Sequence, residues 1–243
     1  MTGSDGRRVQ QRARTPLAPA LRRRHEAHLR RCLRRFGSAG LSPGSPLRPL
    51  QPTAASSTWL ARTAAGQRVV VKSYARQAEC ALETMALEVL DGTAAPRLIA
   101  ADQAVRCVVQ EYLPPARELD WYELGWQLAA CHGRLRLLAP LLSGRGDADG
   151  AVLPPGETSS VAVVDLKRAH IRWRRGGYAF IDYAGIRVGV STWLDLAMLT
   201  RLADGSPALQ RCVHGYRDGT GCGLTQQEAL DRLEAVRTRY GVH

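Results

Sequence analysis

Lysine is almost absent from this chain, which has two lysines and 32 arginines among its 243 residues. Lys72 follows the apolar run Val69–Val71, and Lys167 lies in the segment Asp165-Leu166-Lys167. An arginine side chain is a wide planar fork, whereas a lysine ammonium is a compact charge that can touch one phosphate oxygen in a narrow space. The two lysines therefore mark positions where a compact charge is needed.

Other features are missing as well. The six cysteines form no CxxC pair and have no metal-ligand spacing, which favours reduced thiols over a disulfide framework. No apolar run approaches the ~18 residues of a membrane span. The arginine-rich N-terminus also lacks the apolar core of a signal peptide. These absences predict a cytoplasmic protein, with peripheral contact at the inner membrane face as a further hypothesis.

Positive charge is concentrated at one end of the chain. The net charge is +12, and residues 1–36 contain eleven arginines but only Asp5 and Glu26 as acidic residues. The remaining residues are close to neutral. A basic arm on a neutral body indicates an anionic partner for the arm, and it argues against a body that binds nucleic acid specifically.

The basic arm is expected to contain a helix over Pro19–Phe36. Apolar residues and His25 recur there at spacings of three and four, and arginines cover the other face. Two interpretations stay open. The helix lies on an anionic membrane or a phosphorylated glycolipid, or it packs on the body of the protein with its arginine face in water.

Residues 1–16 of the basic arm are expected to be disordered. The chain after residue 36 divides into three parts, of which the first, residues 37–52, has four prolines and three glycines and forms a linker or loop. Residues 53–113 are expected to form a β-rich lobe with one helix over Glu79–Leu90. Residues 114–243 form a mainly helical lobe, with an exposed loop at 143–160, a hairpin over 172–182, and a last helix that opens with a capping box at Thr225 and Glu228. This order predicts two unlike lobes with a cleft between them.

Four charged residues occur in an order that suits phosphoryl transfer. Lys72 is on a predicted strand and Glu83 on the helix that follows, whereas Asp165 precedes the predicted hairpin and Asp182 ends it. Transfer of a phosphoryl group needs a cation on the nucleotide phosphates, an acid that holds this cation, an acid that receives the hydroxyl proton, and ligands for Mg²⁺. The sequence contains a candidate for each part.

These motifs together resemble the protein-kinase-like superfamily, which includes aminoglycoside phosphotransferases and lipopolysaccharide core kinases. The resemblance covers about Ser56 to Leu202 and rests on Val-Val-Val-Lys72, Glu83 in its helix, Gln110-Glu111-Tyr112-Leu113, Asp165-Leu-Lys-Arg-Ala-His170, Ile181-Asp182 and Asp195-Leu-Ala. It implies an α+β fold with a small antiparallel β lobe and a mainly helical lobe, and it implies a kinase that uses ATP and Mg²⁺.

The resemblance also implies roles for individual residues. Lys72 would hold the α and β phosphates and Glu83 would hold Lys72, although Glu88 lies on nearly the same face of the helix. Backbone groups of Glu111 and Leu113 would bind adenine. The remaining roles are those of the catalytic base Asp165, of Lys167 on the transferred phosphoryl group, of the metal ligand Asp182, and of Asp195 as a brace for the catalytic loop.

The chain departs from the superfamily pattern at several points. His170 stands where most members have an asparagine metal ligand, and an imidazole suits Mg²⁺ less well than an oxygen does. A structural role for His170 is therefore equally open, whereas His132 is assigned to the end of a helix. Val163 replaces the usual histidine, the covering loop Ala54–Thr58 has no glycine, and about 25 extra residues separate His132 from Asp165.

The sequence leaves several functions open. His170 and the Asp195 motif are similar to lipopolysaccharide core kinases, so the preferred acceptor is a sugar hydroxyl of an anionic glycolipid. The alternatives are a serine/threonine protein kinase and a small-molecule phosphotransferase of the aminoglycoside type. A pseudokinase scaffold that binds nucleotide without turnover is the alternative from a different class.

Overall fold

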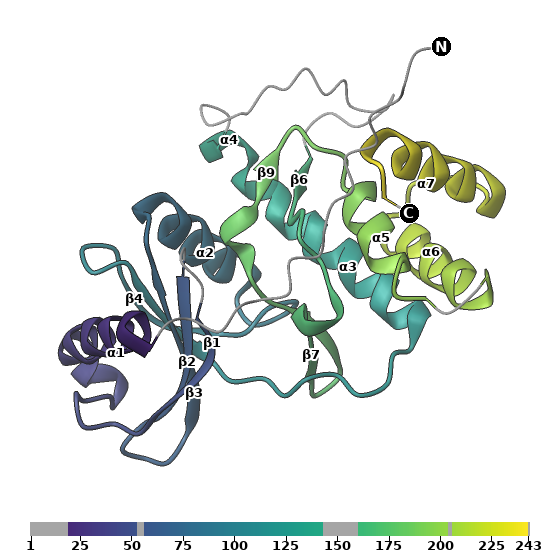
Figure 1. Cartoon of the computed structure of the whole chain (residues 1–243). Coiled ribbons are helices and arrows are strands. Elements are labelled where there is room, and N and C mark those ends of the chain that lie inside the picture. The colour runs from purple at the N-terminus through teal and green to yellow at the C-terminus, as the bar shows by residue number, and fades with distance from the viewer. Residues whose placement is uncertain (1–18, 53–55, 143–159, 204–205, 243) are drawn as a thin grey trace, which may run out of the picture.

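The computed structural model describes residues 19–52, 56–142, 160–203 and 206–242. Figure 1 shows the two unlike lobes that the sequence predicts, with a β-sheet lobe at one end and helices at the other. The predictions for residues 1–16 and for the loop at 143–159 lie outside the described residues. None of the described helices is both long and apolar enough to cross a membrane.

The sheet lobe is a five-stranded antiparallel sheet with the strand order β1-β2-β3-β5-β4. Its strands are β1 (Leu47–Pro52), β2 (Ser56–Arg62), β3 (Arg68–Tyr74), β4 (Leu98–Asp102) and β5 (Cys107–Glu111). Helix α2 (Gln77–Leu90) follows β3 and packs between the sheet and the second lobe. The predicted helix of this lobe is confirmed to within two residues, and the lobe is rich in strands as predicted.

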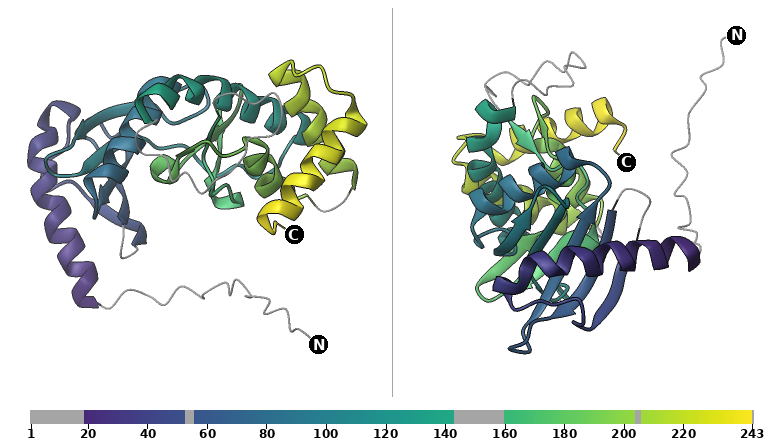
Figure 2. Two further views of the ribbon diagram at one scale, coloured as in Figure 1. Left: turned by 90° about the horizontal axis from the view of Figure 1, so that it is seen from above. Right: turned by 90° about the vertical axis from the view of Figure 1, so that its left-hand side faces the viewer.

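Helix α1 (Pro19–Leu33) and the 3₁₀ helix η1 (Arg34–Ala39) lie across the outer face of this sheet (Figure 2). Leu29, Leu33 and Phe36 are buried there against Trp59 and Val71 and their neighbours. The second interpretation of the basic helix therefore describes the structure, because the apolar stripe is used for packing within the protein. The arginines of the opposite face are mostly exposed.

The expectation that residues 37–52 form a linker is wrong for its last part, which is the edge strand β1. The prolines Pro49 and Pro52 misled the prediction, because proline cannot donate a backbone hydrogen bond. An edge strand has neighbours on one side only, so it tolerates proline where a central strand does not. The register of β1 against β2 shifts between Pro49 and Gln51.

The second lobe is built on a close pair of helices, α3 (Trp121–Leu135) and α6 (Ser206–Thr220). The other elements are η2 (Arg136–Leu138), α4 (Ala139–Leu142), β6 (Val161–Ala162), η4 (Arg168–His170), β7 (Ile171–Arg174), β8 (Gly177–Phe180), η5 (Tyr183–Gly185), β9 (Arg187–Val188), α5 (Trp193–Thr200) and α7 (Gln226–Tyr240). The predicted hairpin is β7–β8, and the capping box of Thr225 with Glu228 is confirmed. Helix α6 was not expected, since the sequence after Gly205 carries no clear apolar period.

Candidate active site

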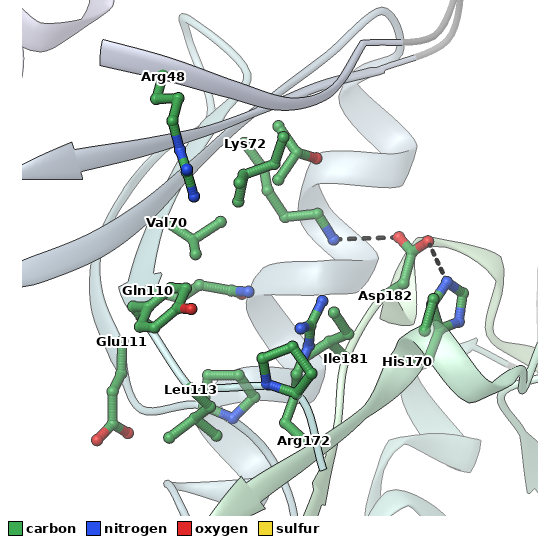
Figure 3. A pocket seen from close by; sticks show the side chains of 16 residues that line it. Arg48, Val70, Lys72, Gln110, Glu111, Leu113, His170, Arg172, Ile181 and Asp182 are labelled. Atoms are coloured by element: carbon green, nitrogen blue, oxygen red, sulfur yellow. Dashed lines mark hydrogen bonds and ion pairs between the residues drawn. The ribbon is translucent and has the colours of Figure 1, made fainter. Parts of the chain in front are cut away.

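A cleft of about 300 Å³ lies between the two lobes. Strands β1, β3 and β5 contribute its upper side, whereas β7 and the segment at Ile181 and Asp182 contribute its lower side (Figure 3). Lys72, His170 and Asp182 lie at one end of the cleft, and Glu111 and Leu113 lie at the other. The cleft therefore joins the segments that the sequence singled out, although Lys72 and Asp182 are 110 residues apart in the chain.

Strand β3 places Lys72 in the cleft by simple alternation. Side chains on a strand point alternately to its two faces. Val69 and Val71 face the core under α1, so Val70 and Lys72 face the cleft. The strand is buried from Val69 to Tyr74. The ammonium group of Lys72 therefore has little contact with water, and its charge has to be stabilised by a neighbouring carboxylate.

Lys72 is held by two carboxylates, one from each lobe. Its Nζ donates to Glu83 Oε1 at 2.8 Å and to Asp182 Oδ1 at 3.1 Å. Burial opposes the charge of Lys72, but the neighbouring carboxylates of Glu83 and Asp182 outweigh it and raise the pKa of Lys72 above its usual value. The rival Glu88 is exposed, so the structure decides for Glu83 as the partner.

Glu83 is fully buried on α2 and has a second partner. Its Oε2 accepts the backbone N–H of Tyr183 at 2.6 Å, which ties α2 to the residue after Asp182. Asp182 has a left-handed backbone, with φ of 76°, a conformation that aspartate tolerates better than most residues. The Lys72 ammonium lowers the pKa of Asp182 despite partial burial, with a smaller contribution from His170.

His170 and Asp165 complete a cluster around Asp182. One potential ligand atom from each of Asp165, His170 and Asp182 lies within 4.8 Å of the others, and His170 Nε2 is 3.4 Å from Asp182 Oδ2. Burial lowers the pKa of His170 to about 4, so the imidazole is neutral near pH 7. Two carboxylates and one neutral imidazole are a donor set that fits a divalent cation.

Asp165 is the most accessible member of this cluster, with a side chain that is 58% exposed. Lys167 Nζ donates to Asp165 Oδ2 at 2.6 Å. Neither group lines the cleft itself, although a carboxylate oxygen of Asp165 lies within 4.8 Å of the ligand atoms of His170 and Asp182, which do. The second lysine of the chain is therefore bonded to one member of the cluster, Asp165, and the first is bonded to another, Asp182.

The segment before Asp165 is held by the buried carboxylate of Asp195 on α5. The N–H groups of Val163 and Val164 donate to it at 2.6 and 2.7 Å. Val164 has a positive φ of 68°, which a β-branched residue adopts only when its surroundings enforce it. Asp195 therefore braces the loop, as the resemblance implied.

His132 belongs to the same brace, which the sequence did not reveal. Its Nε2 is 2.9 Å from Asp195 Oδ2, and its Nδ1 is 2.9 Å from the hydroxyl of Tyr216. The Tyr216 hydroxyl also donates to Thr192. This chain of contacts joins α3, α6 and α5 behind the loop. The histidine is not at the cleft, in agreement with its assignment to a helix.

The other end of the cleft is less polar. Leu113 is buried, and the carboxylate of Glu111 accepts hydrogen bonds from Arg174 and from the backbone N–H of Arg97. The side chain of Glu111 is thus engaged outside the cleft (Figure 3). Of the covering loop, residues 54 and 55 lie outside the described residues, while Ser56–Thr58 belong to β2.

Three charged or amide side chains of the cleft were not assigned a role from the sequence. Arg48 comes from β1, Gln110 from β5 and Arg172 from β7. Burial lowers the pKa of Arg172. Arg172 could have been found, because it follows His170 by two positions on a strand that leads away from the predicted catalytic loop. Arg48 could not, since its strand was interpreted as a linker.

Comparisons with other proteins identify the fold. No protein-family model matches the chain, and no curated protein matches it either. Solved structures do. The macrolide 2′-phosphotransferase MphH from Brachybacterium faecium is 16% identical with a TM-score of 0.56, over 87% of this chain and 91% of that one. A choline/ethanolamine kinase family protein from Mesorhizobium loti is 13% identical with a TM-score of 0.55, over 80% and 75%.

A third match is the aminoglycoside phosphotransferase APH(2″)-IIa in its ternary complex with streptomycin and ATP. It is 14% identical with a TM-score of 0.53, over 81% of this chain and 84% of that one. At such low identity these likenesses establish the fold alone. The chain therefore has a protein-kinase-like fold, and the finer resemblance to lipopolysaccharide core kinases stays a prediction.

Proposed function

We propose that this protein is a kinase that transfers the γ-phosphoryl group of ATP to a hydroxyl group. The observation that carries the proposal is that Lys72, His170 and Asp182 line one end of the cleft, with Glu83 bonded to Lys72 and Asp165 beside His170 and Asp182. The structures that share the fold include phosphotransferases and kinases. One of them was solved with ATP, which supports ATP as the donor.

In this proposal Lys72 holds the α and β phosphates. The buried carboxylate of Glu83 fixes the direction of the ammonium, so that little reorganisation is needed when the nucleotide binds. A bound divalent cation, Mg²⁺ by the resemblance, would supply positive charge to the phosphate oxygens. Asp182 and His170 are the residues that would hold it. Backbone groups of Glu111 and Leu113 would bind the base at the opposite end of the cleft.

Asp165 is the proposed base. Its exposed carboxylate accepts the proton of the acceptor hydroxyl while the new O–P bond forms and the bond to ADP breaks. Lys167, 2.6 Å from Asp165, neutralises the charge on the transferred phosphoryl group. The hydrogen bonds of Asp195 to the backbone before Asp165 fix the position of this loop. Positioning is the main contribution that a protein makes to this reaction.

The experiment is nucleotide binding and turnover of the full chain with Asp165→Asn. The carboxamide cannot take the proton, so turnover falls by about 10²–10⁴-fold, whereas ATP affinity changes less than about threefold. Asp218→Asn, at an exposed site on α6, is the matched control and keeps turnover. A variant Asp165→Asn with normal turnover means that the base is another group.

A scaffold that binds nucleotide without turnover is the second candidate, and His170 is the observation that favours it. The test is ATP turnover by the wild-type chain across sugar, aminoglycoside, choline and peptide acceptors, together with water. Nucleotide binding without any turnover favours the scaffold. Phosphorylation of one acceptor by wild type, with loss of that activity in Asp165→Asn, would exclude the scaffold.

For the acceptor we propose a sugar hydroxyl. An aminoglycoside is the substrate class in the name of one structure with this fold, and the anionic glycolipid remains the more specific hypothesis. The exposed arginines of α1 are what supports it, since a phosphorylated glycolipid carries the complementary charge. A serine or threonine hydroxyl of a protein is the alternative acceptor in the same panel of assays.

A further inference from the structure

We propose that the ion site at the Asp182 end of the cleft selects Mn²⁺ over Mg²⁺, because His170 supplies a nitrogen ligand. This inference rests on the proposed function only in placing a divalent cation at that end of the cleft. It adds which ion the site takes and which residue makes the choice. It is independent of the acceptor.

The separation of His170 and Asp182 is the first argument. Their nearest atoms, Nε2 and Oδ2, are 3.4 Å apart, which is longer than the ~2.7–3.2 Å of an N–H···O hydrogen bond. Two ligands that each lie about 2.1 Å from one ion are about 3 Å apart at a right angle, and further apart at a wider angle. The pair is therefore spaced as two ligands of one ion are.

The other imidazole nitrogen is the second argument. His170 is buried, and its Nδ1 makes no hydrogen bond of normal geometry among the described residues, although the backbone of Asp165 interacts with the ring. A buried polar atom usually has a partner of good geometry, so this ring is held less firmly at Nδ1 than a purely structural histidine would be. When Nδ1 carries the proton, the lone pair of Nε2 points toward a carboxylate. Two electron-rich groups in that arrangement are stabilised by a cation between them.

The ligand chemistry then decides between metals. Mg²⁺ prefers oxygen donors and strict octahedral geometry, and it gains little from an imidazole. Transition-metal ions accept imidazole nitrogen, and Mn²⁺ also accepts the carboxylates of Asp165 and Asp182. An asparagine at position 170 would offer an oxygen to both metals alike. His170 is thus expected to set the preference for Mn²⁺.

The test is direct binding of Mn²⁺ to the full chain with a non-hydrolysable ATP analogue, followed by electron paramagnetic resonance. Displacement by Mg²⁺ gives the ratio of the two affinities. Wild type is expected to prefer Mn²⁺ by at least about tenfold, and His170→Asn to reduce that preference to about twofold or less. Electron spin echo modulation from a bound imidazole nitrogen is expected in wild type and absent in His170→Asn. His214→Asn, an exposed histidine on α6, is the matched control.

Two results overturn the inference. One is an unchanged Mn²⁺-to-Mg²⁺ ratio in His170→Asn with the thermal stability of wild type, and the other is the absence of nitrogen modulation in the wild-type complex. Neither readout needs turnover. Selective Mn²⁺ binding without phosphoryl transfer would leave this inference standing and reject the proposed kinase. Phosphoryl transfer by a protein that binds Mn²⁺ and Mg²⁺ alike would reject this inference and leave the proposed kinase standing.

Discussion

At the scale of single residues, the cleft contains a buried ion pair. Either charge without its partner would destabilise the folded protein. Lys72 and Glu83 are both buried, and each offsets the other's loss of contact with water. Such a pair contributes little net stability compared with apolar residues, but the loss of one partner leaves an uncompensated charge. Glu83 also accepts the Tyr183 N–H, so its neutralisation need not abolish every hydrogen bond.

This asymmetry predicts the outcome of a double-mutant cycle. Lys72→Met should lower the free energy of unfolding by about 3 kcal/mol, because the Glu83 carboxylate is left buried without its cation. Glu83→Gln in the Lys72→Met background should restore part of that loss, since the amide is neutral and its oxygen still accepts from Tyr183. Urea unfolding of the four proteins measures both changes. Losses that simply add would contradict the argument.

The same residues show what a sequence can predict about a site. Lys72, Glu83 and Asp182 were found because each occurs beside an apolar run in a recognisable order. The contact of Lys72 with Asp182 across 110 residues then follows from the fold. Arg48 carries no such signal, since an arginine on a strand is ordinary until the strand is known to face a cleft.

At the scale of elements, helices α3 and α6 pack so closely that only glycine fits between them. A Cβ on Gly215 would lie 1.9 Å from the backbone oxygen of Tyr122, and one on Gly125 would lie 2.1 Å from that of Cys212. Gly215, in the interior of α6, and Gly125, in the interior of α3, are therefore the residues that allow the two helices to pack. Helix propensity penalises glycine, and tertiary contact, which the local sequence does not contain, reverses that preference.

Two substitutions of glycine by alanine should therefore have opposite effects. Gly215→Ala should destabilise the protein by at least about 2 kcal/mol, because the new methyl group overlaps the backbone of α3. Gly133→Ala, in α3 with open space around the position, should stabilise it by up to about 1 kcal/mol through helix propensity. Thermal unfolding measures both. Equal effects of the two substitutions on thermal stability would contradict the close approach of α6 to α3 at Gly215.

Helix α1 carries a titratable group at its contact with the sheet. Burial lowers the pKa of His28 below its usual 6.5, with further lowering by Arg31 and Arg106. The folded protein then binds fewer protons than the unfolded chain below about pH 6.5, so its stability falls as the pH drops through that window. His28→Gln should flatten this decline. Melting temperatures of both proteins from about pH 8 to pH 5 test it, and parallel curves would rule His28 out.

At the scale of the whole molecule, the described part of the basic arm has two sides. Its apolar side packs against the sheet, and its arginine side is mostly exposed. Deletion of residues 1–36 would remove Leu29, Leu33 and Phe36 from the core under the sheet, so it would damage the fold along with the charge. The apolar stripe is also unavailable for insertion into a bilayer. What α1 can offer an anionic surface is its exposed arginine face, and any attraction should be electrostatic and weakened by salt.

Charge substitutions therefore test membrane binding better than a deletion does. Replacement of Arg23, Arg24, Arg31 and Arg34 by glutamine removes four exposed charges from α1 and η1 and should weaken binding to anionic phospholipid vesicles at low salt, by about 1 kcal/mol for each arginine that reaches the surface. The matched control replaces four exposed arginines of the helical lobe and its hairpins, Arg134, Arg136, Arg175 and Arg187. This control has the same net charge as the α1 variant, but it should bind vesicles like wild type. Equal loss in both variants would mean that total charge, and not the face of α1, draws the protein to the vesicle.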